Sequence, residues 1–73
     1  MEAGLLQLHL AQANRHIVEA KRHIAYQRKF IEELARDGHE TDVAEDLLKR
    51  LEEMLLAFEH HRRIVLEGLY MPL

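Results

Sequence analysis

Six histidines in a chain of 73 residues are the side chains best suited to chemistry. His9, His16 and His23 recur every seven residues in the first half of the chain. If the chain folds back on itself, His61 of the second half approaches either His16 or His23. Histidine is a common ligand of transition metals and of haem iron, and helical bundles build such sites from facing side chains. We therefore consider a metal site formed by His16, His23 and His61, with Glu19 beside the first two.

Two features of the spacing weigh against this metal site. Residues seven apart on a helix lie about 10 Å apart along its axis, which is too far for His16 and His23 to bind one ion. The chain has no histidine pair four residues apart, and it lacks the Glu-x-x-His pattern of di-metal carboxylate bundles. Phe30 and Leu47 occupy positions equivalent to these histidines. The other interpretation is therefore a structural role at the edge of a helix interface, with no cofactor bound.

The composition offers little for catalysis. The chain has no Cys and no Ser, and Thr41 is its only aliphatic hydroxyl, so the usual nucleophiles are absent. It also has no glycine-rich loop of the kind that binds phosphate. We expect that the protein is not an enzyme.

A basic row and the apolar segments are candidate sites for larger partners. Arg15, Arg22, Lys29 and Arg36 recur every seven residues and could follow a phosphate backbone. The net charge of −3 and the lack of interleaved aromatic residues argue against a nucleic-acid partner. No apolar run approaches the roughly 18 residues of a membrane-spanning helix, and no cationic leader precedes the first apolar residues. We expect a cytoplasmic protein with no membrane partner.

The elements that must position these residues are two long amphipathic helices. The first half of the chain repeats every seven residues, which predicts a helix over about 3–37. A second heptad pattern predicts a helix over about 42–70, which Pro72 ends. Gly38 lies in the only break, and a turn as short as 38–41 makes the helices antiparallel neighbours. The predicted fold is all-α: one domain formed by a coiled-coil-like hairpin.

Each predicted helix has one contact stripe, interrupted by a single polar residue: Gln27 in the first helix and Arg62 in the second. Beside the stripes, basic residues of the first helix face acidic residues of the second. These charge pairs determine the register of the two helices more than they add to the stability of the hairpin. The expected charge pairs are Lys21 with Glu59 and Arg28 with Glu52. The predicted stripes are Leu6, Leu10, Ala13, Ile17, Ala20, Ile24, Gln27, Ile31 and Leu34, and then Ala44, Leu48, Leu51, Leu55, Phe58, Arg62, Val65 and Leu69.

Both helices are more apolar than a single partner helix requires. Apolar faces of this width are typical of helices in four-helix bundles, and a short chain without disulfides usually needs a partner. We expect a homodimer of two hairpins, with a higher oligomer or an unidentified protein partner as alternatives. The predicted function is a small structural or protein-interaction module, and the alternative is a His-based metal-binding bundle. The predicted interface residues are Phe30, Leu47, Met54, Leu56, Ile64 and Leu66.

Three motifs resemble those of a group of short, uncharacterised bacterial proteins found mainly in rhizobia and related alphaproteobacteria. They are the His-Ile/Leu-x-x-Ala-x-Arg repeat at 9–29, the Arg-Asp-Gly-His-Glu-Thr turn at 36–41 and the Leu-Leu…Phe-Glu…His segment at 47–61. The resemblance covers nearly the whole chain. It implies a bacterial origin, and it carries no activity over to this protein.

Overall fold

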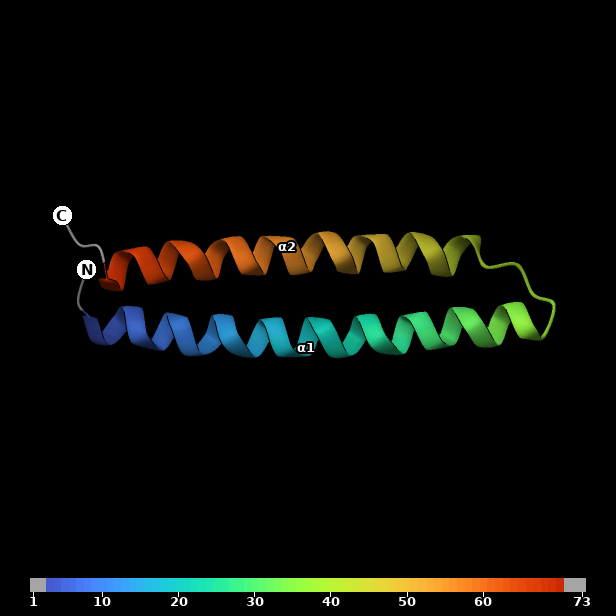
Figure 1. Cartoon of the computed structure of the whole chain (residues 1–73), viewed down its shortest axis with the longest axis horizontal. Coiled ribbons are helices and arrows are strands. Elements are labelled where there is room, and N and C mark those ends of the chain that lie inside the picture. The colour runs from blue at the N-terminus through green and yellow to red at the C-terminus, as the bar shows by residue number, and fades with distance from the viewer. Residues whose placement is uncertain (1–2, 71–73) are drawn as a thin grey trace.

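The structure, a computed structural model that describes residues 3–70, is a hairpin of two long helices (Figure 1). Helix α1 spans Ala3–Arg36 and helix α2 spans Asp42–Tyr70. The helices run antiparallel and side by side, so the beginning of α1 and the end of α2 lie at the same end of the molecule. The expected all-α fold of two packed helices is confirmed. The predicted stop at Pro72 lies outside the described residues.

The molecule is a rod. Its Cα atoms extend over 56 × 15 × 12 Å, and their radius of gyration is 16.6 Å. A compact domain of this length would have a radius of gyration of about 11 Å. Over residues 3–70, neither helix is long and apolar enough to cross a membrane.

The contact between the helices, here called the seam, follows the two stripes that the heptad patterns predict. Six apolar residues are buried, and all six lie on these stripes; every other stripe residue is half-buried. Among the described residues no large side chain is fully enclosed, because each helix has only one neighbour. The buried residues are Ala13, Ile17, Ala20 and Ile24 in α1 and Ala44 and Val65 in α2.

Small residues let the two helices approach each other. Three of the six buried residues are alanines, Ala13, Ala20 and Ala44. At the open end of the hairpin, Gly68 of α2 faces Leu6 of α1, and a Cβ added at Gly68 would lie 3.4 Å from Cδ1 of Leu6. This close approach brings the larger stripe residues of the two helices within reach of each other.

A Schellman motif ends α1. The N–H of His39 donates to the carbonyl of Leu34 at 2.9 Å, and the N–H of Gly38 donates to the carbonyl of Ala35 at 3.1 Å. The backbone of Gly38 has a φ of +77°, a left-handed conformation that a residue without a Cβ adopts at little cost. The helix therefore ends at Arg36, one residue earlier than the sequence pattern predicts.

Thr41 and the first turn of α2 start the second helix. The carbonyl of Thr41 accepts the N–H of Glu45 at 2.8 Å, and its hydroxyl donates to a carboxylate oxygen of Glu45 at 3.0 Å. Asp42 and Glu45 place negative charge in the first turn, where the helix dipole favours it. These interactions set the direction in which the chain returns along α1.

Both polar residues of the stripes bond to the opposite helix. Nε2 of Gln27 donates to the backbone carbonyl of Ala44 at 2.8 Å. Nε of Arg62 donates to Oδ1 of Asn14 at 2.6 Å. Because a half-buried polar group without a partner is costly, these two bonds favour one register of the hairpin over others.

Candidate interaction surface

The seam divides the rest of the hairpin surface into two long faces. Residues spaced alternately three and four apart share one side of a helix, so each face carries one such stripe from each helix. The first, which we call the histidine face, is made mainly of apolar residues and histidines. It consists of Leu5, His9, Gln12, His16, Glu19, His23, Tyr26, Phe30 and Glu33 of α1 and Val43, Leu47, Arg50, Met54, Ala57, His61 and Ile64 of α2.

The second face, which we call the charged face, lies on the opposite side of the seam. Eight of its seventeen residues are Asp, Glu, Lys or Arg, whereas only three of the sixteen on the histidine face are. The charged face consists of Gln7, Ala11, Asn14, Val18, Lys21, Ala25, Arg28, Glu32 and Ala35 of α1 and Glu45, Lys49, Glu52, Leu56, Glu59, Arg63, Leu66 and Tyr70 of α2.

Exposed apolar side chains gather on the histidine face. Eleven large apolar residues are exposed in the described part of the chain, and seven of them belong to this face. Their exposed fractions range from 44% for Leu5 to 83% for Val43. A surface of this kind is unusual in a monomer that has no binding partner. The other five residues are Tyr26, Phe30, Leu47, Met54 and Ile64.

A shallow hollow marks the middle of the histidine face. His16, Glu19 and His23 of α1 line one side of it, and residues of α2 line the other. The ring of His16 lies against that of Phe58, with centroids 5.1 Å apart and planes tilted by 36°. This contact is the kind in which an imidazole covers the edge of an apolar seam. The remaining lining residues are Ala20 of α1 and Leu51, Met54 and Phe58 of α2.

The structure brings together two of the three predicted metal ligands. His16 and His23 line the same hollow with Glu19, while His61 is exposed and is not among the residues around it. Within residues 3–70, no three His, Asp or Glu side chains are grouped closely enough to hold a metal ion. A single hairpin therefore does not assemble the three histidines around one point.

The predicted interface residues divide between the two faces. Phe30, Leu47, Met54 and Ile64 are about half exposed and lie on the histidine face. Leu56, which is 66% exposed, and the half-buried Leu66 lie on the charged face. The heptad pattern alone does not separate the six, because each lies outside the contact stripe. The sequence does contain the signal that separates the two groups. Residues of the histidine face between 43 and 64 form a second stripe of alternating three- and four-residue steps.

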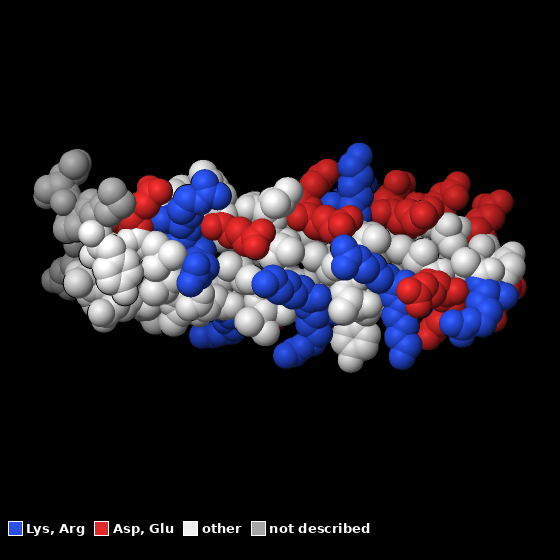
Figure 2. Space-filling view, viewed as in Figure 1, with Lys and Arg blue, Asp and Glu red and all other residues white. Residues whose placement is uncertain are grey.

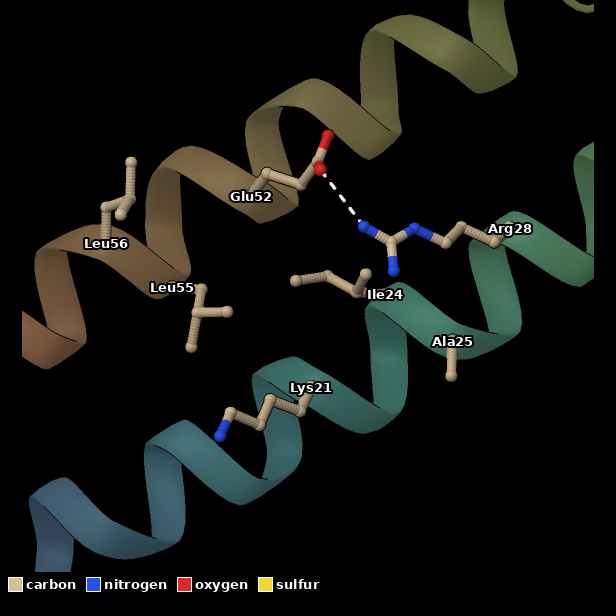
Figure 3. Close-up of a pocket in the computed structure, with 7 residues that line it drawn as sticks. All are labelled: Lys21, Ile24, Ala25, Arg28, Glu52, Leu55 and Leu56. Carbon is tan, nitrogen blue, oxygen red and sulfur yellow. Dashed lines mark hydrogen bonds and ion pairs between the residues drawn. The ribbon is translucent and has the colours of Figure 1, made fainter.

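The charged face carries the ion pair that the sequence predicts. Nη2 of Arg28 lies 3.2 Å from Oε2 of Glu52, above Ile24 and Leu55 between the helices (Figure 3). Both side chains of the pair remain about half exposed, so the pair contributes little to stability. On the side of the molecule seen in Figure 2, acidic side chains gather over α2, and basic side chains lie along α1.

The second predicted pair, Lys21 with Glu59, forms no ion pair among the described residues. Both side chains line a groove on the charged face. Arg62 lies in the same groove, where it donates to Asn14. The hydrogen bond between Arg62 and Asn14 therefore favours this register, and the matching of opposite charges does not predict it.

Comparison with known proteins adds no relative. The chain matches no family model, no curated protein and no solved structure. The resemblance to the alphaproteobacterial group therefore stays a prediction.

Proposed function

We propose that this protein is a small, non-enzymatic interaction module that acts as a homodimer, in which two hairpins form a four-helix bundle. The observation that carries the proposal is the area of exposed surface. The chain exposes 5912 Å², whereas a globular monomer of its 8.6 kDa mass exposes about 4,700 Å². The excess of about 1,200 Å² is larger than the roughly 800 Å² that each partner contributes to a standard protein interface.

The composition of that surface supports association. The exposed residues include eleven large apolar side chains, and their burial is the dominant favourable term in association. Two helices joined by a short turn bury one stripe each, whereas a four-helix bundle buries two. The histidine face supplies the second stripe on both α1 and α2.

Light scattering coupled to size exclusion tests the proposal. We expect about 17 kDa, twice the 8.6 kDa of one chain, at micromolar concentration. Shape does not affect a molar mass from light scattering, so the elongated hairpin is not mistaken for a dimer. A mass of one chain with full helical content over the whole concentration range would contradict the proposal.

Metal binding is a second candidate function, favoured by the hollow that His16, Glu19 and His23 line together. One hairpin supplies these three potential ligands without assembling a site, so an ion would need ligands from a second copy. Protein purified without a histidine tag would then contain stoichiometric zinc, copper or nickel. The metal would be lost in the variants His16→Gln and His23→Gln, and retained in His39→Gln, where the histidine lies in the turn.

A further inference from the structure

We infer that the second copy docks on the histidine face, and that the charged face stays in solvent. This inference rests on the proposed homodimer and specifies which of the two faces forms it. The two faces are similar in size and lie on opposite sides of the same two helices. They differ in how many charged residues an interface would have to remove from water.

On the histidine face, the rows nearest the seam carry no Asp, Glu, Lys or Arg. These rows are His9, His16, His23 and Phe30 of α1, and Leu47, Met54 and His61 of α2. The three charged residues of the face, Glu19, Glu33 and Arg50, all belong to the outer rows. A centre depleted of charge, with charged residues at the edge, is the usual anatomy of a protein interface.

On the charged face, the arrangement is reversed. The rows nearest its seam include Lys21 and Arg28 of α1 and Glu45, Glu52 and Glu59 of α2. Only one ion pair joins them in the described chain, so most of these charges interact with solvent. Docking a second copy here would desolvate all of them, and ion pairs with the opposite charges of the copy would compensate for only part of that cost, which makes this face the less favourable interface.

The size of the histidine face fits a second copy of this chain. Two adjacent helices, each about 10 Å across, present a strip about 20 Å wide along a molecule that extends 56 Å. That strip provides about 1,000 Å² per copy, or about 2,000 Å² in total, which lies in the range of stable dimers. A two-fold axis would match the same stripes on both copies and cover both along their whole length.

Two matched glutamate variants test the choice of face. Met54 lies in the inner row of the histidine face and is 49% exposed, while Leu56 lies two residues further on, on the charged face, and is 66% exposed. Met54→Glu places a charge inside the proposed interface, and we expect the dimer dissociation constant to rise at least about 100-fold. Leu56→Glu adds the same charge to the same helix, and we expect a change below about threefold. Sedimentation equilibrium measures both constants, with circular dichroism as the check on folding.

The chain has no cysteine, which allows a milder second measurement. Met54→Cys is expected to react with a thiol reagent at least about tenfold more slowly at concentrations where the dimer forms than in dilute solution. The reaction of Leu56→Cys is expected to be independent of concentration. Equal behaviour of the two cysteines would overturn the choice of face, even if Met54→Glu failed to fold.

The outcomes separate this inference from the proposed function. A wild-type dimer that Leu56→Glu dissociates and Met54→Glu does not would overturn the choice of face and leave the homodimer standing. A wild-type dimer that both variants dissociate would overturn it as well. A wild-type chain that remains at 8.6 kDa would overturn both, and would leave the histidine face to a different protein.

Discussion

The guanidinium of Arg62 donates from Nε to Oδ1 of Asn14 across the hairpin at 2.6 Å. Arg62 interrupts the apolar stripe of α2, and it is half-buried there. A charge at a seam position loses hydration, and a hydrogen bond to the opposite helix compensates for part of that loss. The pair therefore constrains how α2 slides along α1 more than it stabilises the hairpin.

Removal of one partner should cost more than replacement of both. We expect Asn14→Ala to lower the free energy of unfolding by about 0.5–1 kcal/mol, because Arg62 loses its acceptor at a partly exposed position where water replaces only part of the bond. The double variant Asn14→Ala with Arg62→Leu should regain that stability or exceed it, because leucine completes the apolar stripe. Urea denaturation of the single and double variants measures both effects. A double variant less stable than Asn14→Ala alone would contradict this role of the bond.

Gly38 should resist substitution for backbone reasons alone. A Cβ at this position would meet no atom within 4 Å, but the φ of +77° is unfavourable for a residue with a side chain. We expect Gly38→Ala to destabilise the hairpin by about 1 kcal/mol. Gly4, which lies in helix α1 and also has open space, is the matched control. Gly4→Ala should leave stability unchanged or raise it by up to about 1 kcal/mol, and thermal unfolding of both variants distinguishes the two signs.

The ion pair between Arg28 and Glu52 should contribute little. Its side chains are 59% and 47% exposed, so solvent and salt screen the attraction. We expect Arg28→Gln to change the free energy of unfolding by less than about 0.5 kcal/mol in low salt, and by nothing measurable in about 1 M NaCl. Denaturation at the two salt concentrations tests this. A loss that is large and insensitive to salt would show that the pair does more than set register.

The sequence predicts the hairpin well because the heptad pattern is a local signal. The alternation of apolar and polar residues determines which side of each helix is buried, and all the buried residues, from Ala13 to Val65, fall on the predicted stripes. The short break at Gly38 determines that the helices are neighbours. The pair of Arg28 with Glu52 follows from the register of those stripes, since both positions lie beside the seam.

The partners of individual polar side chains could not be predicted in the same way. Arg62 reaches Asn14, and Gln27 reaches the carbonyl of Ala44, because of side-chain rotamers that the heptad pattern does not specify. The contact of His16 with the ring of Phe58 depends equally on side-chain direction. The sequence also contains the division of the apolar surface into two faces. That division separates Met54 from Leu56 only after the seam between the helices has been placed.

The five-residue turn 37–41 distinguishes the contact between α1 and α2 of one chain from any contact between two chains. It acts as a tether that holds α1 and α2 at a high effective concentration, so their mutual contact does not depend on how much protein is present. Any contact between hairpins has no such tether and follows mass action. If the proposed dimer forms, its population therefore depends on the concentration of the chain, whereas the contact between α1 and α2 does not.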